Sequence, residues 1–338
     1  MRSKRLNKVR NRVFVLLPFF FCYFISAIIG QQIDSKDVPY SGNPIIKHIF
    51  TADPAVLVYK DTFYIYTGHD EQVEGGKPFL MNDWHIFSTT DMVHWKDYGA
   101  ALSLKDFSWA AANAWAGQCV YRNGKFWWYV PMSHRTIKGF AIGVAVADSP
   151  IGPFRDAKGS AIITNDMTTQ VDIDWDDIDP SVFIDDDGQA YLFWGNTRCK
   201  YVKLKSNMIE TEGPIEVIDL PSFTEAPYIH KRGDTYYLSY ASAFPEYIDY
   251  ATSKSIKGPW KYQGRLNDRV FNSPTNHQAI AEYKGNWYFV YHNGALPTGG
   301  EFRRSVCIEQ LKYNPDGTIQ PIIQTKEGVP SIDKIKSK

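Results

Sequence analysis

One pattern of hydrophobic and polar positions recurs five times along the chain. Each copy is a short apolar run, a two-residue turn and a second run rich in aromatic residues. The copies are spaced by 45 to 64 residues, and their turns are Lys60-Asp61, Asn123-Gly124, Asp187-Gly188, Arg232-Gly233 and Lys284-Gly285. Two apolar runs joined by turn residues of this type predict a β-hairpin.

Most of these units continue with further short apolar runs. Trp84–Ser88, Ala141–Ala147 and Tyr247–Thr252 are examples, each followed by polar or Gly-Pro turn sequence. No long stretch has the 3.6-residue period of a helix. Units of this length with about four strands each are typical of propeller blades, so we predict an all-β, five-bladed β-propeller. A β-sandwich is the alternative, but it does not explain five similar hairpins at blade-like intervals.

The first 30 residues differ from the rest of the chain. Residues 1–12 carry six basic side chains and no acidic one, an apolar run follows from Val13 to Ile29, and Gly30 precedes polar sequence. A basic segment, an apolar segment and a small residue are the three parts of a signal peptide. We therefore predict a signal peptide at 1–30, one catalytic domain at 31–338, and a secreted or periplasmic protein with no stable membrane partner. An uncleaved anchor is the alternative.

Charge and composition narrow the class of partner. The chain has 37 basic and 37 acidic residues, and loss of the basic leader would leave an acidic excess, which argues against nucleic acid. Aromatic residues make up 15% of the chain, which suits both strands and the stacking of sugar rings. Cys119, Cys199 and Cys307 lie far apart without zinc spacing, so we expect buried free thiols.

The inner strand of each predicted blade starts near the propeller axis. Counting eight residues back from the hairpin turn gives Asp53, Glu225 and His277 in three of the units. In the other two units the same count gives positions adjacent to Asp179 and to Trp115. Asp-Pro dipeptides are ordinary turn sequences, and a lone histidine is more often structural. Three carboxylates that share one register are harder to explain without a function, because they would repel each other.

Glycoside hydrolysis needs such a set of acids. One carboxylic acid protonates the leaving oxygen, and a carboxylate on the other face of the sugar activates water. A third acidic group nearby can raise the pKa of the acid. Three further residues suit sugar binding: Trp115 has a stacking face, Asn196 an amide, and Arg304 a planar set of donors. Their alternatives are core packing, a turn and a surface strand position.

Several motifs resemble those of glycoside hydrolase family 43. They are Thr-Ala-Asp53-Pro, Asp-Ile-Asp179-Pro, Thr-Glu225-Ala-Pro, Asn-His277-Gln and Phe302-Arg-Arg304-Ser, and the likeness runs from about Asn43 to Ile322. The resemblance implies that Asp53 is the general base, Asp179 raises the pKa of the acid and orients it, and Glu225 is the general acid. It also implies inversion of configuration, with no required cofactor. It further suggests that His277 holds a structural Ca²⁺ ion on the propeller axis through water, or else makes a hydrogen bond that orients an acid or the substrate.

The expected substrate is a plant cell-wall oligosaccharide or polysaccharide. The motif set is most similar to exo-acting α-L-arabinofuranosidases and β-xylosidases that act on arabinoxylan. An endo-acting xylanase or arabinanase of the same family, a fructan-cleaving propeller and a non-catalytic glycan-binding propeller are the alternatives. The aspartate-rich run from Asp172 to Asp187 does not match a calcium-binding loop. We expect most of it, apart from Asp179, to be a solvated loop.

Overall fold

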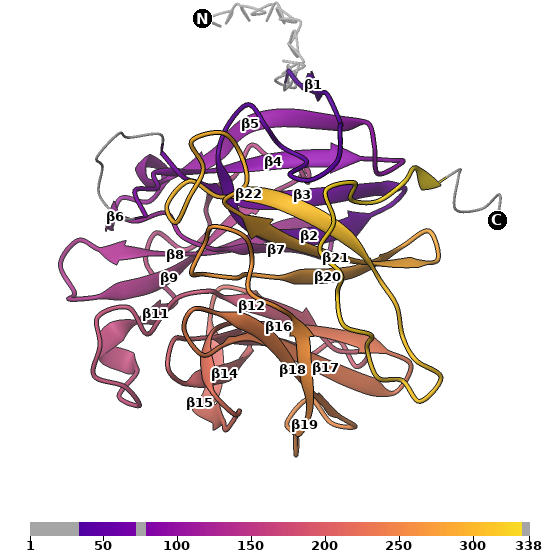
Figure 1. Ribbon diagram of the computed structural model, residues 1–338. Coiled ribbons are helices and arrows are strands. Elements are labelled where there is room, and N and C mark those ends of the chain that lie inside the picture. Colours follow the sequence, from indigo (N-terminus) through magenta and orange to yellow (C-terminus); the bar gives the residue numbers. More distant parts are fainter. Residues whose placement is uncertain (1–33, 72–78, 333–338) are drawn as a thin grey trace, which may run out of the picture. The chain divides into compact units, whose positions relative to one another are not determined.

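The computed structural model describes residues 34–71 and 79–332, which form five antiparallel β-sheets (Figure 1). The first sheet has the order β1-β5-β4-β3-β2, and its strands are β1 (Lys36–Val38), β2 (Thr51–Tyr59), β3 (Thr62–His69), β4 (Asp83–Thr89) and β5 (Trp95–Ser103). The second contains β6 (Ala110–Ala112), β7 (Gln118–Arg122), β8 (Lys125–His134), β9 (Phe140–Ala147), β10 (Arg155–Asp156) and β11 (Ile163–Thr164). Two short 3₁₀ helices, η1 (Leu104–Asp106) and η2 (Asn165–Met167), lie in loops.

The remaining three sheets follow the chain order of their strands. The third consists of β12 (Ser181–Ile184), β13 (Ala190–Trp194), β14 (Cys199–Leu204) and β15 (Thr211–Ile218). The fourth consists of β16 (Phe223–Arg232), β17 (Thr235–Ser242), β18 (Tyr247–Ser253) and β19 (Lys261–Asn267), and the fifth of β20 (Ala279–Tyr283), β21 (Asn286–Asn293) and β22 (Ser305–Leu311).

The five sheets are the blades of a β-propeller, which confirms the predicted fold class. The innermost strands β2, β7, β12, β16 and β20 contact one another in turn, and β20 contacts β2 again to close the ring. Each predicted hairpin joins an innermost strand to its neighbour. The turns at Asn123-Gly124 and Lys284-Gly285 have positive φ at both central residues, as the right-handed twist of a two-residue hairpin requires.

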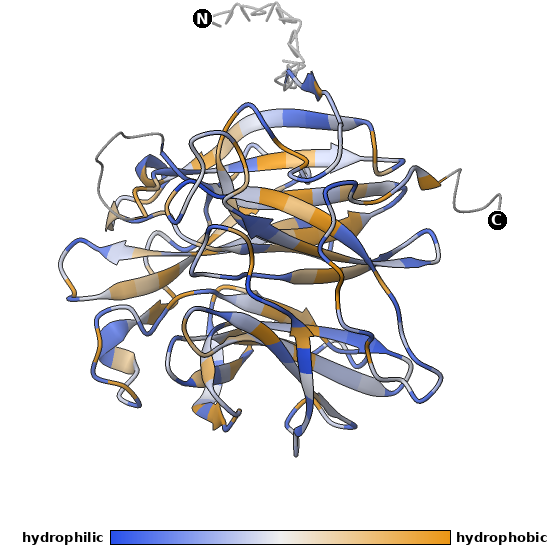
Figure 2. Ribbon diagram, in the orientation of Figure 1, coloured by the Kyte–Doolittle hydropathy of each residue, from blue (hydrophilic) through white to orange (hydrophobic). Residues whose placement is uncertain are grey.

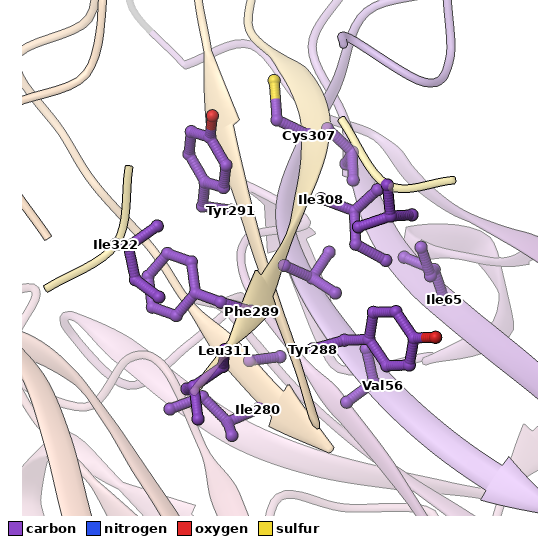
Figure 3. Packing of buried hydrophobic residues seen from close by; sticks show 14 of the residues in the cluster. Val56, Ile65, Ile280, Tyr288, Phe289, Tyr291, Cys307, Ile308, Leu311 and Ile322 are labelled. Atoms are coloured by element: carbon purple, nitrogen blue, oxygen red, sulfur yellow. The ribbon is translucent and has the colours of Figure 1, made fainter. Parts of the chain in front are cut away.

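The hydrophobic core lies between neighbouring blades. Apolar and polar residues alternate along many strands (Figure 2), so that each blade presents an apolar face to the next. Figure 3 shows this packing around the fifth blade, where Tyr288 and Ile308 lie on the side of Val56 and Ile65 of the first blade. The strand β9 is buried along its whole length. Cys119, Cys199 and Cys307 are buried free thiols, as expected.

Blade edges differ from the simple repeat. The strand β1 joins the outer edge of the first blade by pairing with β5, and the fifth blade has only three strands. The segment before β2 runs along the outer edge of β22, where the Ile45 amide donates to the Val306 carbonyl and the Thr51 amide to the Arg304 carbonyl. A segment near the first of the described residues thus completes the last blade.

The aspartate-rich run is more buried than expected, so that prediction is wrong for Asp176 and Asp177. Both side chains are fully buried beside Lys200, whose Nζ lies 2.8 Å from Asp176 Oδ2 and 3.7 Å from Asp177 Oδ1. Thr168 and Trp194 donate the remaining hydrogen bonds to Asp177. Buried charges need such partners, and a sequence of consecutive aspartates does not reveal a lysine more than 20 residues away.

The predicted signal peptide at 1–30 lies outside the described residues. Within the described part of the chain, no helix has the length and hydrophobicity that crossing a membrane would need.

Candidate active site

A pocket of about 360 Å³ opens where the inner strands of the five blades begin. All seven residues that the sequence singled out line it: Asp53, Trp115, Asp179, Asn196, Glu225, His277 and Arg304. The five of these residues that lie at or next to the shared hairpin register thus meet in one pocket, although the register says nothing about their hydrogen-bond partners.

Irregular backbone directs the three acids into this pocket. The strand β2 has a bulge between Ala52 and Ala55, and β16 has register shifts on both sides of Glu225. Asp53 and Asp179 have φ of 52° and 57°, and Ala226, next to Glu225, has φ of 55°. A left-handed conformation costs a non-glycine residue about 1–2 kcal/mol. Such strain is typical of sites where side-chain direction matters more than local stability.

Asp53 is held by a buried arginine. Arg304 Nη1 donates to Asp53 Oδ1 at 2.7 Å. The rest of the guanidinium binds Asp70, with Nε and Nη2 each 2.9 Å from a carboxylate oxygen. Burial alone would raise the pKa of Asp53, but the charge of Arg304 and the contact with His292 together outweigh it and hold that pKa well below its usual value. Asp53 is therefore an ionised carboxylate at neutral pH.

A buried histidine fixes the backbone of Asp53. His292 Nδ1 accepts the Asp53 amide at 3.2 Å, and His292 Nε2 donates to the Thr275 carbonyl at 3.0 Å. The hydroxyl of Thr275 accepts in turn from Arg304 Nη1 at 3.3 Å. Asp53 thus sits in a network that joins the first blade to the fifth.

Glu225 has the opposite protonation preference. Burial raises its pKa to about 7, and the negative charge of Asp53 adds to the effect. Asn196 Nδ2 donates to Glu225 Oε2 at 2.8 Å, which partly opposes the rise because it stabilises the ionised form. At neutral pH a large share of Glu225 carries the proton that a general acid has to give.

Asp179 lies beside Glu225 through the backbone. Its Oδ2 accepts the Ala226 amide at 3.0 Å, so it orients the residue that follows the acid. Burial raises the pKa of Asp179 well above its usual value, with further contributions from the charges of Glu225 and Asp53. The resemblance implies two tasks for Asp179, to raise the pKa of Glu225 and to orient it. The contact of Asp179 with the Ala226 amide suits the orienting task.

His277 makes no direct hydrogen bond to the acids. Its Nδ1 is 3.8 Å from Asp179 Oδ2, too far for a hydrogen bond. Burial lowers the pKa of His277 to about 4, so the ring is neutral at neutral pH and keeps a lone pair. A neutral imidazole among carboxyl groups fits a dication. In the described chain, however, no group of three ligand atoms converges here. The residues therefore fit an ion held largely through water.

Four functional candidates escaped the sequence analysis. Asp70, Thr275 and His292 organise Asp53, and Glu246 is a fourth buried carboxyl that lines the pocket. Burial raises the pKa of Glu246, and the charge of Glu225 raises it further. None of the four lies at the register position shared by the inner strands, so the counting rule could not find them.

Aromatic side chains form the wall and rim of the pocket. Trp115 packs against Phe140 at 4.4 Å between ring centroids and against Phe79 at 5.8 Å. Trp175 and Phe244 also line the pocket but are 48% and 66% exposed. Exposed aromatic faces beside a polar pocket are typical of surfaces that stack on sugar rings.

The sequence matches a known family over most of its length. The profile of glycosyl hydrolases family 43 matches residues 41–319. A xylosidase/arabinosidase of Bacteroides ovatus is 31% identical, over 80% of this chain and 94% of the relative. An arabinoxylan arabinofuranohydrolase of Bacillus subtilis (strain 168) is also 31% identical, over 87% of this chain and 66% of the relative.

The chain also resembles solved structures of proteins with xylosidase or arabinofuranosidase names. One is a β-xylosidase/α-arabinofuranosidase from a compost microbial metagenome, in complex with xylotriose and in a calcium-free form. It is 30% identical with a TM-score of 0.75, over 85% of this chain and 98% of that one. Another is an α-L-arabinofuranosidase of Clostridium thermocellum ATCC 27405, which is 38% identical with a TM-score of 0.69 and the same coverage.

Proposed function

The chain belongs to glycosyl hydrolases family 43, and on that premise we propose that it is an exo-acting α-L-arabinofuranosidase or β-xylosidase acting on arabinoxylan-type glycans. The observation that carries the proposal is the pairing in one pocket of an ionised Asp53 with Glu225, whose raised pKa keeps it partly protonated at neutral pH. Relatives named for xylosidase and arabinofuranosidase activities support the substrate class.

The chemistry follows from these protonation states. Glu225 gives its proton to the glycosidic oxygen, and Asp53 takes a proton from the water that attacks the anomeric carbon. Asp53 and Glu225 come from the first and fourth blades, and in this proposal they act on opposite faces of the bond, which inverts configuration. Asp179 holds the backbone next to Glu225, so it acts as an orienting residue.

We assign substrate contacts from the ring faces and hydrogen-bonding atoms that each side chain does not use within the protein. Trp115 offers a ring face in the pocket wall. Asn196 contacts Glu225, so its remaining amide atoms can bind a sugar hydroxyl. Arg304 uses its donors on Asp53, Asp70, Thr275 and Met81, which assigns it to holding the base rather than the sugar.

A hydrated calcium ion on the axis would be held by His277 in this proposal, and it would supply positive charge near the carboxyl groups. His277 would contribute its neutral ring, and Asp179 lies beside it, with Oδ2 3.8 Å from His277 Nδ1.

The test compares Glu225→Ala with Asp53→Ala on two substrates. An aryl glycoside has a good leaving group and needs little protonation, so Glu225→Ala should retain much more activity on it than on an arabinoxylan oligosaccharide. Asp53→Ala should lose about 10²–10⁴-fold on both, because no other group activates water. Equal losses on both substrates in the two variants would overturn the assignment of roles. Tight glycan binding without any hydrolysis by the wild type would instead support a binding propeller.

We also propose that the chain is secreted after cleavage near Gly30, on the basis of its basic and apolar leader. Mass spectrometry of the exported protein should find an N-terminus within a few residues of Gln31. An exported chain that still begins at Met1 would contradict this.

A further inference from the structure

Two histidines and an aspartate meet in the first blade, away from the lining of the sugar pocket. His69 ends β3, while Asp83 and His85 lie on β4. Thr67 pairs with His85 and Gly68 with Trp84, so His69 continues the register opposite Asp83. Since side chains alternate along strands, His69, Asp83 and His85 project from the same face of the sheet.

The three side chains converge on one point. His69 Nδ1 is 2.9 Å and His85 Nε2 is 3.3 Å from the same oxygen, Asp83 Oδ1. The ligand atoms all lie within 4.8 Å of one another. Neighbouring ligands around a tetrahedral zinc ion, with bonds of about 2.0–2.1 Å, are about 3.3 Å apart. The cluster therefore needs only small side-chain movements to surround an ion.

Two orphaned atoms beside the cluster provide a second observation. His85 Nδ1 and Thr67 Oγ1 are both buried and have no hydrogen-bond partner among the residues that the structure describes, although they belong to directly paired residues. A metal on His85 Nε2 would place the ring proton on Nδ1. The Thr67 hydroxyl opposite could then accept it, as the second ring nitrogen of a metal-bound histidine requires.

The donor set selects the kind of ion. Two imidazole nitrogens and one carboxylate oxygen suit zinc and similar first-row divalent ions. Calcium prefers six to eight oxygen ligands, whereas this cluster offers one carboxylate and two imidazoles. The side chains of His69, Asp83 and His85 are 20%, 25% and 12% exposed, which leaves room for water to complete the coordination.

We propose that His69, Asp83 and His85 form a zinc-class metal site that clamps β3 to β4. Each ring binds the ion through the nitrogen that faces Asp83 and keeps one proton on its other nitrogen, and a ring that is doubly protonated releases its second proton to solvent. The residue after His69 is Asp70, which binds the guanidinium and the amide of Arg304. The clamp thus stiffens the strand end from which Arg304 and Asp53 are held, without contacting substrate.

The test is a calorimetric titration of the full, tag-free, chelator-treated chain with ZnCl₂, repeated with CaCl₂. We expect one zinc ion per chain at this site and a rise in the thermal unfolding midpoint on zinc addition. His85→Phe should weaken zinc binding at least tenfold and abolish the rise. Asp83→Asn keeps the shape of the side chain and should have the same two effects. It provides the test if His85→Phe does not fold. The calcium titration should be identical in all three proteins.

His48→Gln is the matched control. His48 Nε2 lies 2.8 Å from Asp97 Oδ2 in the same blade, but no third ligand joins this pair among the described residues. This variant should keep the zinc affinity and the midpoint shift of the wild type. Equal zinc binding by the wild type, His85→Phe and Asp83→Asn would overturn the proposal, and so would the absence of binding by the wild type.

Discussion

Single residues in the pocket acquire different chemistry from different neighbours. Asp53 is a buried carboxyl group and Glu225 a partly buried one, yet Asp53 is held ionised and Glu225 tends to keep its proton. The difference comes mainly from Arg304, whose Nη1 lies 2.7 Å from Asp53 Oδ1, whereas the side-chain hydrogen bond to Glu225 found among the described residues comes from the neutral amide of Asn196. The positions of the two acids follow from the sequence, but their roles depend on these partners.

The alkaline limb of the pH profile should report on Glu225. Its pKa of about 7 means that kcat/KM falls as pH rises through neutrality, because the acid loses its proton. Asn196→Ala removes a hydrogen bond that favours the ionised form, so the pKa of Glu225 should rise and the limb should move to higher pH. The measurement is kcat/KM against pH for both proteins on a natural glycan. A limb that stays in place or moves to lower pH would contradict the role given to Asn196.

How far the sequence predicts the site depends on the kind of residue. Asp53, Glu225 and His277 share one register because each lies near the start of an inner strand, and this local rule can be read from the hairpin turns. Asp70 and His292 sit on second strands or just after them, and they reach Asp53 only once blades one and five are side by side. Such partners are set by tertiary contacts between distant segments, and no local pattern predicts them.

At the scale of elements, the pocket depends on loops held between blades. Glu246 lies in the turn between β17 and β18, where its amide donates to the Pro274 carbonyl at 2.8 Å. Its Oε2 accepts the Asn276 amide at 2.7 Å. These two bonds bracket Thr275, which binds both Arg304 and His292. Glu246 therefore fixes the loop that supports the base and carries His277.

Removal of the Glu246 side chain should lower kcat more than it lowers the stability of the fold. Glu246→Ala should reduce kcat by about 10- to 100-fold, because small displacements of catalytic groups have effects of this size. Glu246→Gln keeps an oxygen acceptor for the Asn276 amide and should retain most of the activity. Steady-state kinetics of both variants on one glycan, with kcat and KM separated, would measure this.

Glu309 offers a control for Glu246. It is also buried and its Oε1 accepts a backbone amide, that of Thr325 at 2.6 Å, but it does not line the pocket. Glu309→Ala should lower the unfolding temperature and leave kcat near the wild-type value. If Glu309→Ala lowered kcat as much as Glu246→Ala, the effect of Glu246 would be one of general stability.

Strand elements show where local patterns fail. The hairpins were predictable because turn residues and aromatic runs are adjacent in sequence. The buried pair Asp176 and Asp177 was not, because consecutive aspartates normally indicate a solvated loop. Lys200 on β14 reverses that expectation by supplying a buried positive charge. Whether acidic side chains of a loop can be buried thus depends on a positively charged partner on another element.

For the molecule as a whole, the pocket exists because the ring of blades is closed. Each blade supplies a residue to the pocket, so displacement of one blade would separate the acids. The number of blades was predictable from the repeated hairpins, but the way the ring is completed was not. The pairing of the segment before β2 with β22 joins residues more than 250 positions apart, and such pairing leaves no periodic signal.

Asn43 should be important for this closure. Its amide nitrogen donates to the Ile308 carbonyl, Glu309 Oε1 and the Thr325 carbonyl, and its oxygen accepts the Ile308 amide. Asn43→Ala leaves these groups without partners, so the free energy of unfolding should fall by about 2–3 kcal/mol. KM should not change, because the residue is not in the pocket. Urea unfolding followed by tryptophan fluorescence and circular dichroism would measure the loss.

Asn207→Ala is the comparison that separates ring closure from the loss of any asparagine. Asn207 is exposed and bonds only to Glu210 and Ile209 of its own hairpin, so its removal should change the free energy of unfolding by no more than about 0.5 kcal/mol. Because the five blades share cores across their interfaces, fluorescence and circular dichroism should report the same midpoint for Asn43→Ala. An early transition seen by one probe alone would mean that the first and fifth blades can separate while the others stay folded. The contact between the first and fifth blades would then unfold separately, and closure of the ring would not be part of the cooperative unfolding of the whole propeller.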